Sequence, residues 1–529
     1  MPCLALALAA CAKTGNGTSE GAQVLRIGIQ GSPGTLQPLL TSDTTDKMIG
    51  RLLFDPLVSV DASGKRDVPI LAAKVPTLVN GGISRDGLTI TYDLRRDVRW
   101  HDGAPFTSRD VAFSWRAIVN PANNISSRAG YDLVRSVDTP NAHTAVFHLK
   151  ERYSPAVDSL FAESDTPMFI VPEHLLGRLR NVNTAAFNAA PIGTGPFKFL
   201  RWQRGDRIEL VANERYFLGK PKLKAIVLKI IPNESTEVNQ LRAHELDWIF
   251  EPSPVLYGQL RAFPGVRTPL SQRNAVEELL INGRRPPLDD IRVRSAIASA
   301  LDRRTMVAKL TFGSAQVADD EHPPFMWAHV GGFSYAYDPA HSRRLLAAAG
   351  WTPGADGVVQ KRGRRLTLTV AYNGSNATRR AAVVLLQAYL HAVGVETTLK
   401  SYPLTLFAAP LGSGGILAGG AFDLSFTGFV AGVDPDDSVR FMCRSVPPGG
   451  DDYVRYCNPA MDAAERIALE HYDRAARKMA YARIEALIRR DLPQIFLWWP
   501  RQVQAIDERF GGFAPNPVNE AWNAWQWRI

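Results

Sequence analysis

Two stretches decide the fold: Asp97-Val-Arg-Trp-His-Asp-Gly-Ala-Pro-Phe-Thr-Ser-Arg-Asp-Val111 and Pro191-Ile-Gly-Thr-Gly-Pro-Phe-Lys-Phe199. The first follows an apolar and polar alternation over 88–94, which predicts a strand. Thr107 and Asp110 then predict the start of a helix, since both side chains can bond the free N–H groups of its first turn. The glycines of the second stretch predict a tight corner before a strand over 197–200. Neither pattern requires a catalytic group.

Length and composition predict a soluble protein with several cores. The chain has 529 residues, of which 45% are apolar and 21% charged, and a formal net charge of +9. Single cores stop growing near roughly 300 residues, so two or three are expected. The positive charge is scattered arginine, without the basic run or aromatic-rich strand of nucleic-acid readers. A solvated basic surface is the simpler interpretation, and no nucleic-acid partner is expected.

Strands and helices alternate throughout the chain, which predicts an α/β architecture with mostly parallel sheets. The expected strands cover 24–30, 226–231, 366–371 and 495–499. The expected helices cover 44–54, 108–119, 234–243, 377–393 and, as one long stretch, 459–490.

Taken in this order, the two quoted stretches resemble "W-x-D-G-x-P-x-T-A-x-D-V" and "P-x-G-T-G-P-Y" of the peptide/nickel/opine family of ABC-importer solute-binding proteins. Further matches extend over nearly the whole chain, at 36–38, 57–64, 213–221, 241–247, 337–351 and 457–462. The resemblance implies a periplasmic-binding-protein-like, two-lobe clamshell of type II, from the large cluster with an extra inserted subdomain.

The resemblance also implies a division of the chain. Lobe I is expected from 23–55, 188–275 and 493–529, an inserted subdomain from 56–187, and lobe II from 276–492. The strand over 495–499 would return the chain to lobe I. Two crossings between lobes make a hinge, so a ligand that contacts both lobes shifts the equilibrium from open to closed.

The amino terminus resembles that of a bacterial lipoprotein. Residues 1–10 are short and apolar, and Leu8-Ala9-Ala10-Cys11 matches a lipobox, so Cys11 is the expected lipid anchor and 11–22 a flexible linker. The positive n-region of a secretory signal is missing, so either the true start lies upstream or the match is accidental. No other stretch approaches the ~20 apolar residues of a membrane span, so membrane contact is expected through the lipid alone.

The cysteines divide into two groups. Cys3 would leave with the signal and Cys11 would carry lipid, which leaves Cys443 and Cys457 around a Pro-Pro-Gly-Gly loop. In an oxidising compartment we expect these two to form a disulfide, the alternative being two unpaired buried thiols. Two cysteines without a histidine partner are a poor zinc site, and neither a metal nor a cofactor is expected.

The ligand site departs from the family pattern. In the peptide binders, a segment resembling "F-D-x-x-x-x-G-W-x-x-D" places an aspartate in the cleft for the ligand's α-ammonium. The matching run 422–435 has Phe429 at the tryptophan position and Gly432 at the aspartate position. A buried ammonium without a counter-charge is costly, so either Asp434 reaches in or the ligand has no free amino terminus. The alternative role of Asp434 is to cap a turn.

Other ligand contacts are expected from where residues lie relative to the first strand and to the family's contact positions. Gly31, Ser32, Pro33 and Gly34 follow the first strand, at the carboxyl edge where open α/β sheets bind ligands. Tyr131 and Tyr402 lie where relatives place aromatic contacts, although an aromatic residue at such a position is more often in the core.

Competing functions find less support. The sequence contains no P-loop, H-E-x-x-H or G-x-G-x-x-G motif, so no enzymatic activity is expected. We expect a monomeric receptor that delivers a peptide or similar small polar ligand to the permease subunits of an ABC importer. A nickel-type chelate receptor and a surface receptor that imports nothing are the alternatives.

Overall fold

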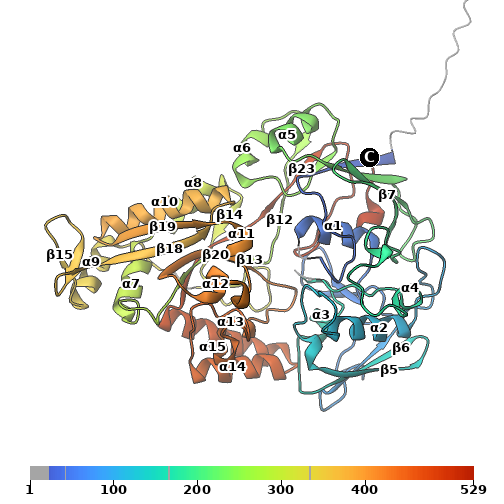
Figure 1. Cartoon of the computed structure of the whole chain (residues 1–529), viewed down its shortest axis with the longest axis horizontal. Helices are drawn as coiled ribbons and strands as arrows, with labels where there is room; N and C mark the ends of the chain where they lie inside the picture. The colour runs from blue at the N-terminus through green and yellow to red at the C-terminus, as the bar shows by residue number, and fades with distance from the viewer. Residues whose placement is uncertain (1–22, 42, 165–166, 333–334) are drawn as a thin grey trace, which may run out of the picture.

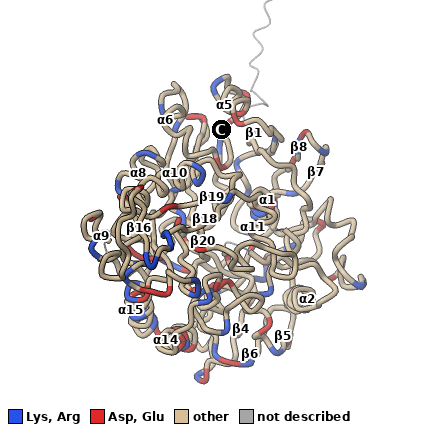
Figure 2. Tube along the Cα trace, turned by 60° about the vertical axis from the view of Figure 1, so that its left-hand side comes forward, with Lys and Arg blue, Asp and Glu red and all other residues tan. Residues whose placement is uncertain are grey.

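The computed structural model describes residues 23–41, 43–164, 167–332 and 335–529, which form two lobes lying side by side (Figure 1). The expected signal peptide, linker and lipid anchor Cys11 lie outside the described residues. Within the described ranges, no helix is both long enough and apolar enough to cross a membrane. Basic and acidic positions are interspersed over both lobes, as Figure 2 shows.

A seven-stranded mixed sheet forms the centre of lobe I. Its order is β11 (Val266–Arg267), β23 (Ala505–Asp507), β10 (Trp248–Ile249), β1 (Val24–Ile29), β9 (Ala225–Ile230), β8 (Arg207–Ala212) and β7 (Phe197–Gln203). β1 is parallel to β9 and β10, whereas the other neighbours are antiparallel. The expectation of mostly parallel sheets is therefore wrong here, because a hairpin and a returning C-terminal strand complete the sheet. Helices α1 (Thr44–Leu53), α5 (Glu234–Arg242) and α6 (Tyr257–Leu260) belong to this lobe.

The stretch expected as an inserted subdomain, 56–187, forms two small sheets and short helices beside lobe I. Its elements are β2 (Val58–Val60), β3 (Asp67–Pro69), β4 (Thr89–Asp93), α2 (Ser108–Val119), β5 (Val134–Asn141), β6 (Thr144–Leu149), α3 (Ala156–Ser159) and α4 (Glu173–Leu176). Buried apolar side chains from this stretch and from the large sheet form one continuous cluster, which includes Leu25, Phe147 and Trp527. The subdomain is thus fused to lobe I through a shared core.

The two stretches that decide the fold meet in the structure. The backbone N–H of Gly193 donates to His101 Nδ1 at 3.1 Å, and His101 Nε2 lies 3.0 Å from the carbonyl of Gly195. The ring is therefore neutral with its proton on Nε2, and burial lowers the pKa of His101 to about 4. A Cβ on Gly193 would lie 1.8 Å from the Leu53 carbonyl oxygen, so this close approach requires glycine.

Lobe II is built on a six-stranded sheet in the order β14 (Ala315–Val317), β21 (Gln494–Pro500), β13 (Ala275–Ile281), β20 (Leu424–Val430), β18 (Thr367–Asn373) and β19 (Glu396–Tyr402). β18 is parallel to β19 and β20, and the remaining pairs are antiparallel. The surrounding elements are α7 (Ile291–Ala300), α8 (Arg303–Thr311), α9 (Pro339–Ala348), β15 (Thr352–Pro353), β16 (Val359–Lys361), β17 (Arg364–Arg365), α10 (Ala377–Ala392), α11 (Leu404–Phe407), α12 (Ile416–Gly419), α13 (Ser438–Phe441), α14 (Pro459–Glu470) and α15 (Arg474–Asp491).

Two sequence expectations are corrected in lobe II. The strand over 495–499 does not return the chain to lobe I, because β21 pairs with β13 in the middle of the lobe II sheet. Lobe II therefore continues to about Pro500 instead of ending at 492. The long helix over 459–490 is also wrong. It is interrupted after Glu470, and Asp473 starts α15 by accepting a hydrogen bond from the backbone N–H of Ala476 at 2.8 Å.

The hinge is a two-stranded ladder of the segments that cross between the lobes. β12 (Leu270–Ser271) enters lobe II and β22 (Gln502–Val503) leaves it, and the two pair antiparallel. Arg273 beside this ladder donates to the Gln502 side chain at 2.9 Å. Each crossing is only a few residues long, so rotation about this ladder is the simplest relative motion of the lobes.

A second contact between the lobes lies away from the hinge, where the α14–α15 turn meets the 56–187 subdomain. We call it the distal contact. The backbone N–H of Ser154 donates to the Leu469 carbonyl at 2.7 Å, and the Tyr472 hydroxyl donates to the Gly87 carbonyl at 2.9 Å. Arg474 pairs with Asp67 at 3.1 Å. The lobes therefore touch both at the hinge and at the distal contact, an arrangement that we call closed.

Candidate ligand-binding site

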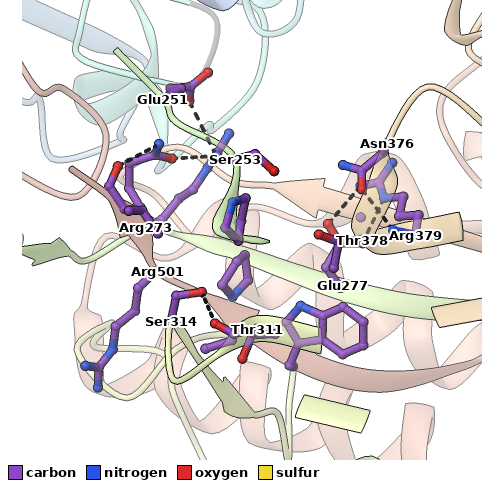
Figure 3. A pocket seen from close by; sticks show the side chains of 18 of the residues that line it. Glu251, Ser253, Arg273, Glu277, Thr311, Ser314, Asn376, Thr378, Arg379 and Arg501 are labelled. Atoms are coloured by element: carbon purple, nitrogen blue, oxygen red, sulfur yellow. Dashed lines mark hydrogen bonds and ion pairs between the residues drawn. The ribbon is translucent and has the colours of Figure 1, made fainter. Parts of the chain in front are cut away.

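A cavity of about 490 Å³ lies between the lobes beside the hinge, and Figure 3 shows its walls. Lobe I contributes Gln30 at the end of β1 and the segment 251–254 after β10. The hinge segments contribute Arg273 and Gln502, and lobe II contributes β13, β20 and the start of α10. This volume suits a ligand of a few residues or a compact chelate.

The lobe I wall is acidic and is held in place by backbone bonds. Glu234 at the start of α5 accepts a hydrogen bond from the backbone N–H of Ser253 at 2.6 Å. Glu251 lies 3.5 Å from the Arg273 guanidinium. Burial raises the pKa of Glu251, an effect that the positive charge of Arg273 opposes. A ligand cation beside this wall would further stabilise the charged form of Glu251.

The lobe II wall carries a bidentate ion pair. Arg379 donates to Glu277 through Nε and Nη2, both at 2.9 Å. Burial alone would lower the pKa of Arg379, but the Glu277 carboxylate holds it above its ordinary value. The pair lies against Gly428 of β20, where an added Cβ would come within 2.6 Å of the guanidinium. Glycine is therefore needed there for the pair to line the cavity.

The start of α10 also faces the cavity. Its cap residue Asn376 accepts a hydrogen bond from the backbone N–H of Arg379 at 2.9 Å, and Ala377 and Thr378 line the wall beside it. Free N–H groups and the helix dipole favour negative charge at such an end. The cavity therefore offers cationic and anionic surfaces a short distance apart, with Phe429 and Trp498 as the apolar part of the wall.

Of the predicted contacts, Phe429 lines this cavity. Gly432 lies just beyond it, where the lobes approach each other: an added Cβ would lie 3.5 Å from the Ser164 Cβ of the subdomain. Asp434 is buried and bonded to both Nη atoms of Arg477, at 2.7 and 2.6 Å. In the closed structure Asp434 therefore already has its counter-charge and does not line the cavity.

The remaining predicted contacts lie outside the walls of this cavity. Gly31, Ser32, Pro33 and Gly34 follow β1, and the backbone N–H of Gly34 is directed to Asp46, whose pKa burial raises to about 7. Tyr131 is buried in the lobe I core, with its hydroxyl accepting a hydrogen bond from the Phe161 backbone at 2.7 Å. Tyr402 ends β19 and packs against the cluster around Phe407.

A disulfide joins Cys443 and Cys457, and it closes the loop that carries Asp452. The charged residues of the cavity were not predicted from the sequence: Glu251, Arg273, Glu277 and Arg379. One signal was available for the last of them. Asn376 is a capping residue that follows the end of β18 by a short turn, so it marks a helix that begins at the carboxyl edge of the sheet. The Glu277 and Arg379 pairing is non-local and leaves no local pattern.

The model of the bacterial extracellular solute-binding proteins, family 5 Middle, matches residues 68–450. The oligopeptide-binding protein AppA of Bacillus subtilis is 26% identical over 99% of this chain and 96% of its own. A probable di/tripeptide-binding protein of Pseudomonas aeruginosa is 26% identical over 90% of this chain and 89% of its own. The structure of NikZ from Campylobacter jejuni in complex with Ni(L-His) has a TM-score of 0.81 and 26% identity, covering 96% of this chain and 100% of that one.

Proposed function

Because this chain belongs to the bacterial extracellular solute-binding proteins of family 5, we propose that it captures a peptide or similar small polar organic ligand by hinge closure. It then delivers this ligand to the permease subunits of an ABC importer. The protein acts extracytoplasmically as a monomer, held to the membrane by a lipid on Cys11. It carries the ligand without changing it chemically.

The observation that carries this proposal is a cavity whose walls come from both lobes and from the hinge. Contacts from both sides exist together only in the closed form, so a ligand that makes them favours closure. The walls present opposite charges, with Glu234 and Glu251 on lobe I and the start of α10 on lobe II. A zwitterionic peptide has charges that match both walls.

Peptides are proposed as the ligand class because relatives over nearly the full length are oligopeptide-binding and di/tripeptide-binding proteins. Gly432 stands where the family's peptide binders carry the aspartate for the α-ammonium. We therefore expect short peptides with a free amino terminus to bind more weakly than peptides in which the terminus is blocked or remote. Gly432→Asp would restore a preference for the free terminus.

Calorimetric titration of the purified chain with tripeptides, free and N-acetylated, tests the proposal. Micromolar or tighter binding of any tripeptide supports it, and mass spectrometry of molecules that co-purify would identify the natural ligand. Arg379→Met should weaken peptide binding by about tenfold, because it removes the cationic part of the wall and leaves Glu277 unpaired. Arg304→Met on lobe II, outside the walls of the cavity, is the matched control. Absence of binding by every peptide would refute the proposal.

A metal chelate is the second candidate, favoured by the likeness to a structure that holds Ni(L-His). The cavity walls among the described residues contain no histidine or cysteine, so such a metal would arrive with its own ligands. Elsewhere, Asp319, Asp320 and His329 lie close together, but Asp320 already accepts hydrogen bonds from the backbone N–H groups of Val330 and Gly331. Heat on titration with Ni(II) and histidine, and none with peptides, would establish this alternative.

A further inference from the structure

A side cavity of about 240 Å³ opens beside the main one in lobe II. The two cavities share Arg379, Gly428 and Phe429 in their walls, so they adjoin at this point. The Arg440 guanidinium lies 4.1 Å from the centre of the Phe429 ring and closes the wall behind it. The two cavities therefore share part of one wall, and a ligand group that enters the side cavity from the main one would pass beside Phe429.

One wall of the side cavity is apolar. Leu404 and Phe407 of α11 and Leu417 of α12 form it, and Leu404 is 52% exposed although its neighbour Phe407 is buried. An aliphatic stem lying on these side chains would be removed from water at about 25 cal/mol per Å² of apolar surface. This wall favours an extended hydrocarbon chain.

Another part of the lining consists of the carboxylates of Asp451 and Asp452, which form no ion pair among the described residues. Asp452 is 1% exposed, and its Oδ1 accepts a hydrogen bond from the backbone N–H of Tyr456 at 3.0 Å. Its Oδ2 has no hydrogen-bond partner among the described residues. Asp451 beside it accepts from the hydroxyl of Tyr453 at 2.8 Å. A buried carboxylate oxygen without a partner is costly, so this end of the cavity favours a ligand group that donates hydrogen bonds and carries positive charge.

The cations near this wall are already engaged. Arg440 bonds both oxygens of Glu278, at 2.6 and 2.7 Å, and Arg379 pairs with Glu277. Arg455 donates to two backbone carbonyls, both at 2.8 Å. Burial raises the pKa of Asp452 to about 6, with backbone N–H groups and Arg455 opposing this rise. The carboxyl group therefore lacks the neutralisation that its neighbours have.

We propose that the side cavity receives a basic side chain of the ligand, with its aliphatic stem on Leu404 and Phe407 and its ammonium or guanidinium group at Asp452. This inference rests on the proposed function and gives the ligand a chemical class: peptides that contain lysine or arginine. The disulfide between Cys443 and Cys457 holds the loop that presents Asp452, so the site is braced covalently.

Calorimetric titration with a set of alanine tripeptides tests the inference. One alanine, at the first, second or third position, is replaced by lysine or by norleucine, which has the same stem without the charge. At one position lysine should bind at least about tenfold tighter than norleucine. Asp452→Asn should reduce this advantage to about twofold or less, whereas Asp452→Glu should retain much of it. Asp132→Asn, an exposed position in the 56–187 subdomain, should leave the advantage unchanged.

The norleucine peptides also serve as the folding control, because their affinity should be the same in the original chain and in Asp452→Asn. The inference is overturned if norleucine binds as tightly as lysine at every position, or if the lysine advantage persists in Asp452→Asn. Failure of all tripeptides to bind would instead remove the proposed function, and this inference with it.

Discussion

The lobes meet in two places that are built differently. At the hinge, two covalent crossings pair as a short ladder, and the Arg273 to Gln502 bond joins side chains from the crossings themselves. These interactions remain when the lobes rotate. At the distal contact no chain crosses, and the bonds of Ser154, Tyr472 and Arg474 must break if the cleft opens. The distal contact, not the hinge, therefore sets how much of the unliganded protein is closed.

The largest expected effect is on stability, and it should differ between a buried ion pair near the distal contact and an exposed ion pair within it. Arg477 and Asp434 form a bidentate pair inside lobe II with side chains 5% and 2% exposed, whereas Arg474 reaches across to Asp67 with its side chain 48% exposed. Arg477→Met strands a buried carboxylate and should cost about 3 to 5 kcal/mol of unfolding free energy. Arg474→Met should cost less than about 1 kcal/mol. Chemical denaturation measures both, and equal losses would contradict this distinction.

The next effect is a pH dependence of closure, because carboxyl groups from both lobes lie close together at the distal contact. Burial and the carboxylates of Asp67 and Asp434 hold the pKa of Asp158 well above its usual range, against the opposing charge of Arg474 and Arg477. A raised pKa in the closed form means that protonation favours closure. The protonated carboxyl of Asp158 therefore stabilises the closed form fully below the ordinary aspartate pKa, and this stabilisation is lost as pH rises through the raised pKa.

The closed fraction should therefore increase, by about severalfold, as pH falls from neutral toward the ordinary aspartate pKa. Small-angle X-ray scattering of the unliganded chain measures it, and Asp158→Asn should flatten the pH dependence. Asp132→Asn, at an exposed position that the raised pKa of Asp158 does not involve, should leave the pH dependence intact. A closed fraction that rises with pH would show that protonation of Asp158 does not favour closure.

The distal contact includes Tyr472, which was not predicted from the sequence to lie in a turn. α2 matched its predicted bounds because its cap is local: the Thr107 N–H bonds the Asp110 carboxylate at 2.8 Å. The cap at Asp473 is equally local. It lies within the helical pattern expected over 459–490, so the turn that carries Tyr472 was not predicted.

Long-range pairing explains the other errors of the sequence analysis. β21 reads as a buried strand, yet its place beside β13 depends on partners such as Ile495 and Leu279 that lie far apart in sequence. The walls of the cavity also depend on residues that lie far apart in the sequence. Phe429 was found because it belongs to a motif, whereas the pair of Glu277 and Arg379 is assembled by two strands and a helix that the fold alone brings together.

A smaller effect isolates one hydroxyl of the distal contact. Tyr472→Phe removes the hydroxyl that donates to the Gly87 carbonyl at 2.9 Å, with the Tyr153 carbonyl at a longer 3.3 Å, and retains the ring. One such bond contributes about 1 kcal/mol, so the ratio of closed to open protein should fall about fivefold. Scattering reports the change in ratio. Tyr337→Phe on an exposed part of lobe II is the matched control, and equal behaviour of the two variants would count against the assigned role of Tyr472.

The smallest effect is expected at the hinge. Gln502→Met removes the acceptor of the Arg273 bond but leaves the ladder between β12 and β22. Because this bond is present in open and closed forms alike, the ratio of the two should change by less than about twofold. If Gln502→Met opened the protein more than Tyr472→Phe, the hinge would be the controlling contact and the comparison would be reversed.

Closure of the lobes around a bound peptide can be measured by scattering. The purified chain is stripped of bound molecules by unfolding, dialysis and refolding, and its scattering is compared before and after addition of a tripeptide shown by calorimetry to bind. We expect a smaller radius of gyration with peptide, and a scattering profile that matches the closed structure. An unchanged profile at saturating peptide would contradict it.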